Sequence, residues 1–317
     1  MLTPEQKAIR LTGIGGSEIG AIAGLNPWMQ PIDVYRRKVE GYEEPDNAAM
    51  ERGRFLERGT ADWWAYRRLA TLREVGTIVD PRNKLVVCTP DFLAKPSEGA
   101  ELDLSIKVPG PRAWLDWGDD GTDQIPEAYL AQVQWELIAL SELHGITTSE
   151  VAAPIGGDLR VYRVPADKEL QGLLLTAAER FWRDHVLPRR PPEPDGSEGY
   201  AKHLRARFPG GSAVTVTASV QAEEWARRYF EAREQKVEAE TRMELARQCL
   251  ESEMGDATKM VGTDFRISWA VTKGRPSTDW EAVCEAAKVP KALVEQHTTR
   301  TPFRTFRPTS MKEASNG

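Results

Sequence analysis

The sequence has no long hydrophobic run. Within its 317 residues, no apolar stretch approaches the ~20 residues that are needed to span a bilayer. The N-terminal residues, MLTPEQKAIRLTG, also lack the apolar segment of a secretory signal peptide. These two absences argue against a membrane protein and predict a cytoplasmic one.

Cysteine is scarce, and positive charge is not in excess. Cys88, Cys249 and Cys284 lie far apart and form no CxxC pair, so we expect neither a disulfide framework nor a zinc site. The 42 lysines and arginines are outnumbered by 48 aspartates and glutamates, which gives a formal net charge of −6. That balance excludes a uniformly basic surface but remains compatible with a local basic groove for nucleic acid.

The composition that is present, 40% hydrophobic and 28% charged residues, is typical of a folded globular protein. Helices and strands are predicted in mixed order, which favours an α/β (α+β) domain with a central mixed sheet flanked by helices. The predicted strands cover residues 75–79, 85–88, 101–107, 151–155 and 159–164, and the longer helices cover residues 48–69, 127–143 and 167–185.

A proline-rich segment, PRRPPEP at residues 188–194, predicts a domain boundary. Residues 219–254 beyond it predict a long amphipathic helix, residues 259–271 a small hairpin and residues 303–307 a terminal strand. We therefore divide the chain into a core (residues 1–195), a linker (196–212) and a C-terminal helical and hairpin appendage (213–317).

The candidate site is centred on two predicted strands that carry charged residues at their ends. The strand at residues 85–88 runs into Pro90-Asp91, and the strand at 101–107 alternates between an apolar and a polar face. The polar face comprises Glu101, Asp103, Ser105 and Lys107. An aspartate beside a polar face that ends in a lysine is the arrangement that holds a divalent metal next to a charge that steers a water or a phosphate. An ordinary hairpin with one solvated face is the alternative.

Three further features carry polar groups at defined positions. Gly15-Gly16-Ser17 predicts a tight turn into a helix capped by Ser17, where free amides and the nearby Arg10 would bind a phosphate; a plain capped turn is the alternative. Glu57 falls on the packed face of the helix at 48–69, where a carboxylate needs a partner or a metal. Gln132 and Glu136 lie one turn apart beside the apolar stripe of the helix at 127–143.

These features occur in one order along the chain. The series is Arg10, Gly15-Gly16-Ser17, Gly24-Leu25-Asn26-Pro27-Trp28, Gly53-x-x-Leu56-Glu57, Thr89-Pro90-Asp91, Ser105-Ile106-Lys107 and Tyr129-Leu130-Ala131-Gln132-Val133-Gln134-Trp135. Over roughly residues 8–165, this series resembles the YqaJ-type viral recombinase family. That family comprises the lambda-exonuclease-like phage alkaline exonucleases of the PD-(D/E)xK superfamily, so the resemblance implies a restriction-endonuclease-like core.

The resemblance also implies roles for residues at matching positions. Asp91 matches the metal-binding aspartate, and Glu57 matches the helix-borne acid that completes the metal site. Lys107 matches the lysine that orients the water or stabilises the pentavalent phosphate, and Gln132 matches the glutamine of the following helix. The implied cofactor is Mg²⁺, with Mn²⁺ as the alternative.

The resemblance implies a substrate and partners as well. Arg10 and Ser17 match a pocket that such exonucleases use for a terminal 5′-phosphate. The implied activity is 5′–3′ digestion of double-stranded DNA ends for phage-type recombination in a phage or bacterial host cell. The implied partners are a single-strand annealing protein and further copies of the chain, in a ring trimer.

One position departs from the pattern. The family pattern has an acidic residue two positions before the lysine, and this chain has Ser105, a neutral residue and a poor Mg²⁺ ligand. Asp103 lies on the same strand face about 7 Å away, which we expect to be too far for direct replacement. An inactivated site, a relocated carboxylate and a weakened site all remain open. The corresponding alternative function is a catalytically impaired DNA-end-binding or interaction protein.

Overall fold

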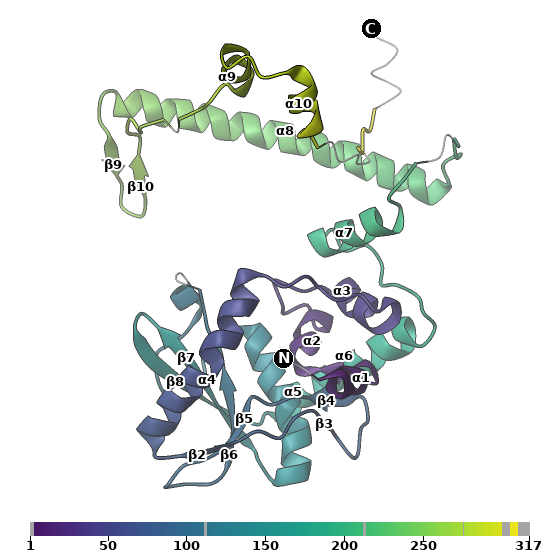
Figure 1. The fold of residues 1–317 in the computed structure, drawn as a ribbon, viewed down its shortest axis with the longest axis vertical. Coiled ribbons are helices and arrows are strands. Elements are labelled where there is room, and N and C mark those ends of the chain that lie inside the picture. Colours follow the sequence, from purple (N-terminus) through teal and green to yellow (C-terminus); the bar gives the residue numbers. More distant parts are fainter. Residues whose placement is uncertain (1–2, 111–112, 212–213, 275, 300–304, 310–317) are drawn as a thin grey trace. The chain divides into compact units, whose positions relative to one another are not determined.

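The computed structural model describes residues 3–110, 113–211, 214–274, 276–299 and 305–309 (Figure 1). The chain divides into two compact units, residues 1–207 and residues 208–317. Each unit is described below by itself. The first unit contains every residue that the sequence predicts for the functional site.

The first unit is built on a five-stranded sheet with the strand order β2-β5-β6-β7-β8. Its strands are β2 (Thr71–Arg73), β5 (Phe92–Lys95), β6 (Leu102–Ile106), β7 (Thr148–Ile155) and β8 (Asp158–Pro165). Strands β6 and β7 are parallel and are connected through helix α5 (Glu127–His144), whereas the other neighbours are antiparallel. The sheet is therefore mixed, which confirms the predicted fold class.

A smaller sheet brings the N-terminal turn beside the main one. Strand β4 (Val86–Cys88) pairs in parallel with β1 (Ile14–Gly15) and antiparallel with β3 (Ile78–Val79). Because β4 leads through Pro90 and Asp91 directly into β5, the glycine turn after β1 lies close to the start of β5. The predicted strand at 75–79 is shorter than expected, and β2 and β5 were not predicted. The expected pairing of the strand at 85–88 with the strand at 101–107 is wrong, because β4 pairs with β1 and β3 while β6 pairs with β5.

Helix α4 (Ala48–Arg68) covers one face of the main sheet. Its Trp64 packs with Phe92, Leu104 and Ile106 in a buried apolar cluster. The buried residues of α4, Thr60, Ala61 and Trp64, all lie in its C-terminal half. Trp64 Nε1 also donates a 2.9 Å hydrogen bond to Glu150 on β7, so this half of the helix is fixed to the sheet.

Helix α5 covers the opposite face of the sheet. Its Val133 and Leu137 pack with Leu93 and Val151. Asp103 is the register partner of Leu93, so Asp103 and Ser105 point to the α5 side. The alternative of an ordinary hairpin with a solvated face is wrong, because Asp103 is 0% exposed and Ser105 is 1% exposed.

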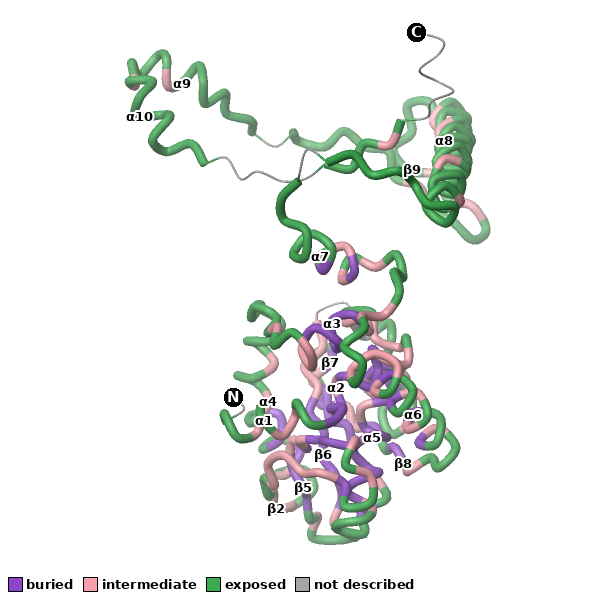
Figure 2. The backbone as a smooth tube through the Cα atoms, turned by 90° about the vertical axis from the view of Figure 1, so that its right-hand side faces the viewer, coloured by how far each residue is buried: buried purple, intermediate pink, exposed green. Residues whose placement is uncertain are grey.

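The other helices of the first unit surround a second part of the core. They are α1 (Pro4–Leu11), α2 (Gly16–Ile22), α3 (Pro31–Tyr35) with a π turn at Arg36–Glu40, α6 (Lys168–Phe181) with a π turn at Trp182–Val186, and α7 (Glu198–Arg207). Trp135 and Ile138 of α5 pack here against Ile19 of α2 and Leu174 of α6. Figure 2 shows buried backbone running through α2, α5 and β6.

The segment expected as a linker, residues 196–212, contains a helix. Helix α7 buries Tyr200 and His203, and Tyr200 belongs to the cluster around Trp135. The first unit therefore extends to residue 207. The proline-rich composition indicated a boundary too early because two residues beyond it pack into the core.

The second unit consists of helix α8 (Val220–Met254), the hairpin β9 (Lys259–Val261) and β10 (Arg266–Ser268), and the short helices α9 (Trp280–Ala286) and α10 (Lys291–Gln296). Ser219 caps α8 with a hydrogen bond from the Ala222 amide. Within α8 only Met254 is buried, and Figure 2 shows the helix exposed along almost its whole length. The predicted strand at 303–307 lies partly outside the described residues, and residues 305–307 form no strand.

We expect residues 1–207 to fold when the second unit is deleted, because the described core clusters all lie within the first unit. A truncated protein should be soluble, with a cooperative thermal transition within a few degrees of the full chain. Circular dichroism melting of both proteins measures this. Aggregation of the truncated chain would contradict a self-sufficient first unit.

No helix in the described ranges is long and apolar enough to cross a membrane.

Candidate functional site

Asp91 is held at the end of β6 although it precedes β5 in sequence. Its Oδ2 accepts a 2.7 Å hydrogen bond from the Ile106 amide, and the Ser105 hydroxyl lies 3.5 Å from the same oxygen. Lys107 follows directly after Ile106, and its own amide donates to Ala152 on β7. The pairing of β5 with β6 thus fixes Asp91, Ser105 and Lys107 in one place.

Glu57 reaches this place from α4. Its carboxyl is half-buried, and its pKa is raised first by that burial and then by the negative charge of Asp91, while Lys107 opposes the shift. Three predicted residues from three separate elements are therefore close enough to affect one another. The expectation that Glu57 shares a fully packed face is wrong in one respect, because its neighbour Leu56 is exposed.

Aromatic rings border the lysine. The Lys107 ammonium lies 5.4 Å from the centre of the Tyr129 ring on α5, within the range of a cation–π interaction. The Tyr129 ring lies 5.9 Å from the exposed Trp28. Trp28 was interpreted only as part of a helix end, so its position beside the site was missed.

Two carboxyl groups are buried on the α5 side of β6. Asp103 Oδ2 accepts a 2.6 Å hydrogen bond from the Ser149 hydroxyl, whereas its buried Oδ1 has no hydrogen-bond partner. Burial raises the pKa of Asp103 to about 7, and the Asp91 charge adds to that effect. Ionised Asp103 is costly here unless a cation lies nearby.

Glu136 is the second buried carboxyl group, and it is 3% exposed. Burial raises its pKa to about 8, assisted by the charges of Asp103 and Asp91 and opposed by Lys107. Gln132, one turn earlier on α5, donates a 3.0 Å hydrogen bond to Glu136 Oε1. Gln132 therefore contacts the buried acid through its side-chain amide.

Arg10 and Ser17 are in contact, as the predicted phosphate pocket requires. Arg10 Nη2 donates a 3.1 Å hydrogen bond to Ser17 Oγ. Ser17 is not the helix cap, however, because α2 begins at Gly16 with Gly15 as its cap. The Gly15 amide is not free either, since it donates a 2.7 Å hydrogen bond to Glu18 Oε2.

The same turn contains a buried ion pair that sequence reasoning missed. Lys38 Nζ lies 2.6 Å from Glu18 Oε2, and both side chains are almost fully buried. Burial lowers the pKa of Lys38, and the Glu18 charge opposes that shift. Lys38 also donates to the Arg10 carbonyl oxygen at 2.6 Å, so this pair fixes the backbone from which Arg10 extends. The only sequence signal of this pair is the basic cluster Arg36-Arg37-Lys38, a pattern that is more typical of a solvated helix face.

The glycine turn joins the two halves of the site. A Cβ atom on Gly16 would lie 3.0 Å from Glu136 Oε1, and one on Gly15 would lie 2.9 Å from Arg10 Nη2. The Arg10–Ser17 pair and the buried carboxyl group of Glu136 therefore flank the same turn. In the described part of the chain, no group of three or more His, Cys, Asp or Glu side chains is arranged to hold a metal ion.

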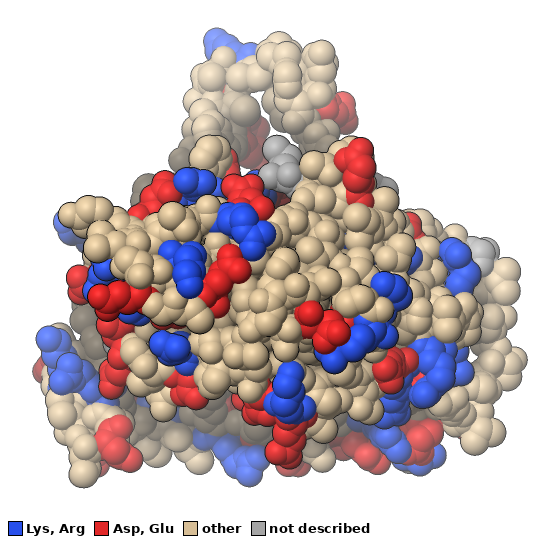
Figure 3. Space-filling model, turned by 90° about the horizontal axis from the view of Figure 1, so that it is seen from below, with Lys and Arg blue, Asp and Glu red and all other residues tan. Residues whose placement is uncertain are grey.

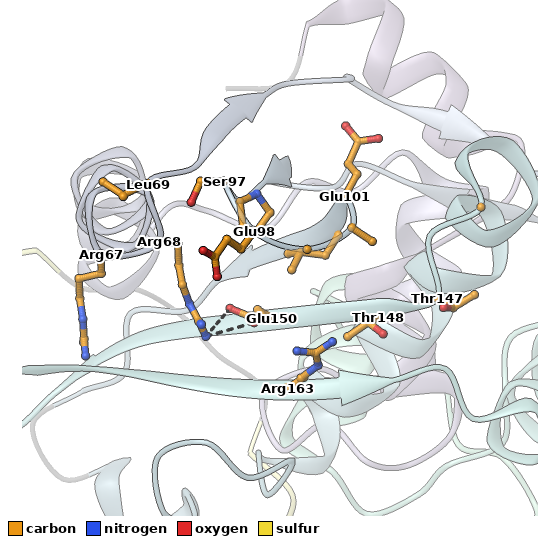
Figure 4. Close-up of a pocket in the computed structure, with 15 residues that line it drawn as sticks. Arg67, Arg68, Leu69, Ser97, Glu98, Glu101, Thr147, Thr148, Glu150 and Arg163 are labelled. Atoms are coloured by element: carbon orange, nitrogen blue, oxygen red, sulfur yellow. Dashed lines mark hydrogen bonds and ion pairs between the residues drawn. The ribbon is translucent and has the colours of Figure 1, made fainter.

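A cavity of about 460 Å³ lies away from this cluster, at the opposite ends of β5 and β6. Figure 4 shows Arg68 and Glu150 paired on one wall and Arg163 pointing into the same space. Glu150 accepts hydrogen bonds from both Trp64 and Arg68. The charged groups of Arg68 and Glu150 therefore satisfy each other. The cavity contains none of the residues predicted for the site.

Charge on the visible surface is mixed. In Figure 3, Lys and Arg side chains are interspersed with Asp and Glu side chains, without a broad area of one sign on that face. On this face, Lys and Arg side chains therefore occur only in small groups.

Residues 5–149 match the YqaJ-like viral recombinase domain, the family that the motif series resembles. The chain is 27% identical over 267 residues to the uncharacterized protein YqaJ of Bacillus subtilis strain 168, which covers 82% of this chain and 81% of that protein.

Solved structures give weaker similarities. The alkaline exonuclease LHK-Exo from Laribacter hongkongensis is 18% identical, with a TM-score of 0.45, over 65% of this chain and 100% of that one. Its complex with dAMP has a TM-score of 0.46, and it covers 65% of this chain and 98% of that one at 18% identity. A phage-related exonuclease from Haemophilus somnus 129PT is 13% identical, with a TM-score of 0.43, over 56% of this chain and 96% of that one.

Proposed function

We propose that this protein is a metal-dependent DNA exonuclease that resects double-stranded ends in the 5′–3′ direction for recombination by single-strand annealing. The observation that carries this proposal is the meeting of Asp91, Glu57 and Lys107 from three elements at the end of β6. Two carboxylates beside a lysine suit phosphodiester hydrolysis, and the YqaJ-like domain at residues 5–149 supports the same class of reaction.

The residues present fit a divalent cation. Mg²⁺ keeps several waters and is usually bound through one or two carboxylates, so a group of three acids is not required. The buried Asp103 Oδ1, which has no partner, is an oxygen that a cation would satisfy. Asp91 and Glu57 would hold Mg²⁺, or Mn²⁺ in its place, next to the position of Ser105. A bound cation supplies charge stabilisation for the phosphate and a water of lowered pKa.

The other groups have separate tasks. Lys107 carries a positive charge at the edge of the carboxylate group, where it would orient the attacking water or stabilise the pentavalent phosphate. Gln132 would position its acceptor, Glu136 Oε1. Tyr129 limits where the lysine can move, because the two side chains are in contact. Asp91 keeps its orientation through the Ile106 amide.

The Arg10–Ser17 pair would bind the terminal 5′-phosphate. We expect the double variant Arg10→Ala/Ser17→Ala to lose activity on 5′-phosphorylated ends but little on 5′-hydroxyl ends. Each lost charge-assisted contact should cost about 1.5–3 kcal/mol, or roughly ten- to a hundredfold. Steady-state digestion of the two matched duplexes measures this. Equal losses on both substrates would instead indicate damage to the fold around Lys38.

The proposed partners are double-stranded DNA ends, a single-strand annealing protein and further copies of the chain in a ring trimer. A ring would separate a DNA-facing lining from an outer surface of mixed charge.

The second candidate is a catalytically impaired DNA-end-binding protein, which Ser105 favours because it is neutral where the family pattern has an acid. One assay separates the two candidates. Linear duplexes with 5′-phosphate or 5′-hydroxyl ends are incubated with Mg²⁺, with Mn²⁺ or with EDTA. Metal-dependent release of nucleotides supports the exonuclease, whereas end binding without release supports the second candidate.

A further inference from the structure

The site lacks a negatively charged group at Ser105 and has an additional carboxyl group, Glu136, on the helix that covers the same face of the sheet. Ser105 is buried at the end of β6 and brings no negative charge to Asp91. Helix α5 covers this face of the sheet and carries Glu136, a carboxyl group that has no basic partner among its described contacts. A buried carboxylate without a cation is strongly unfavourable, so the presence of Glu136 here needs a physical reason.

The surroundings of Glu136 are those of a ligand site. Its neighbour across the interior, Asp103, has a fully buried oxygen, Oδ1, with no hydrogen-bond partner in the described structure. Burying a polar atom in this state is unfavourable. Asp103 and Glu136 each interact electrostatically with Lys107 and with Asp91. A divalent cation bound at Asp91 and Glu136 would neutralise Glu136 and bring positive charge near the buried Asp103 Oδ1.

The glycine turn leaves room for this carboxyl group. Gly16 approaches so closely that a side chain there would lie 3.0 Å from Glu136 Oε1. Gln132 Nε2 holds the same oxygen from the other side. One oxygen of Glu136 is thus oriented by a hydrogen bond within α5 and faces the glycine turn, and hydrogen bonds of this kind orient metal ligands.

We propose that Glu136 is a metal-binding residue, which supplies from α5 the carboxylate that Ser105 does not supply from β6. The cation then lies between the end of β6 and α5, with Asp91 on one side and Glu136 on the other. Lys107 stays beside it, so the charge distribution of the site is preserved although one ligand comes from a different element. This inference rests on the proposed metal dependence, but its test does not require DNA cleavage.

The first experiment measures metal binding directly. Mn²⁺ is titrated into the full-length protein at pH 8 by calorimetry, and the thermal transition is recorded with and without Mn²⁺. We expect Glu136→Gln to weaken Mn²⁺ binding at least about tenfold and to remove most of the metal-induced rise in Tm. Glu142→Gln is the matched control, since Glu142 lies on the same helix but is exposed and pairs with Arg82.

Folding is monitored in the same samples. The glutamine amide keeps the shape of the side chain and can still accept from Gln132, and it removes a charge from the interior. The metal-free Glu136→Gln protein should therefore be as stable as the wild type, or more stable. Wild-type Mn²⁺ affinity and an unchanged Tm shift in a folded Glu136→Gln protein would overturn the proposal.

The second experiment moves the carboxylate from position 136 on α5 to position 105 on β6. In the double variant Ser105→Glu/Glu136→Gln, the acid returns to β6, on the same strand face as Lys107. We expect this variant to recover Mn²⁺ binding that Glu136→Gln alone has lost, whereas Ser105→Gln/Glu136→Gln, which adds the same volume without charge, should not. Equal binding by the two double variants would count against an exchange of carboxylate positions.

Cleavage assays then separate this inference from the proposed function. If the wild type binds Mn²⁺ through Glu136 but does not digest DNA, the metal site stands and the exonuclease proposal fails. If the wild type digests DNA and Glu136→Gln binds metal and digests it equally well, the exonuclease stands and the role of Glu136 fails.

Discussion

Replacing Asp91 by alanine or asparagine should abolish metal-dependent DNA cleavage, with a loss of roughly a thousandfold or more. A metal site contributes several kcal/mol of transition-state stabilisation, and each ~1.4 kcal/mol corresponds to a factor of ten in rate. Asp91 is the acid that lies nearest to both Ser105 and the amide of Ile106, so no other described carboxylate can take its position.

The two substitutions distinguish chemistry from folding. Alanine leaves the Ile106 amide without its acceptor, whereas asparagine retains an oxygen that can accept that hydrogen bond but carries no charge. Both variants should bind duplex ends almost as the wild type does, as measured by fluorescence anisotropy in EDTA. Asp158→Ala, at the exposed first residue of β8, is the control and should remain active. Unchanged cleavage by Asp91→Asn would remove Asp91 from the metal site.

The metal-free protein should lose stability as the pH rises from about 4.5 to about 8.5. Burial raises the pKa of Glu136 to about 8 from an ordinary value of 4.5. Between these two pH values the folded protein binds more protons than the unfolded chain, so the free energy of unfolding falls with rising pH. At about 1.4 kcal/mol per pKa unit, the loss is on the order of 5 kcal/mol. Asp103, whose pKa is raised to about 7, acts in the same direction.

Urea denaturation at a series of pH values measures this effect. The groups that face Glu136 are Gln132 on its own helix, Asp103 and Lys107 from β6 and its end, and Asp91. Glu136→Gln should flatten the profile, and Mg²⁺ should restore stability to the wild type at high pH but not to the variant. A wild-type profile that is flat from pH 5 to 8.5 would show that Glu136 does not titrate in this range.

Local sequence signals predicted much of the fold because they have local causes. Ser219, Asn47 and Asp167 cap their helices with hydrogen bonds to backbone amides. The sequence grouped Asp91 with Lys107 through a hairpin of residues 85–88 and 101–107, whereas the strand that pairs with β6 and brings the two residues together is β5. The burial of the β6 polar face could not be predicted, because alternation of polar and apolar residues is equally typical of a solvated face.

The role of Glu136 was hidden for a similar reason. A glutamate one turn after Gln132 is a common helix-surface pattern, and only the packing of α5 on the sheet shows that this one is buried. The pattern did place both residues beside the apolar stripe. Ser17 was assigned as a cap because the turn contains two glycines, and the structure shows that Glu18 takes the amide that was expected to be free.

The attachment of α4 has a mechanical consequence. This helix is fastened to the sheet only beyond Thr60, through Trp64 and the hydrogen bond to Glu150, whereas Glu57 lies just before the fastened part. Asp91 is held by a backbone amide of the sheet itself. Displacing Glu57 by an ångström therefore requires bending only the outer turns of a helix, while displacing Asp91 would require breaking the sheet. One side of the proposed site is therefore rigid and the other is compliant. In the proposed exonuclease, an incoming DNA strand would close the distance between the two sides.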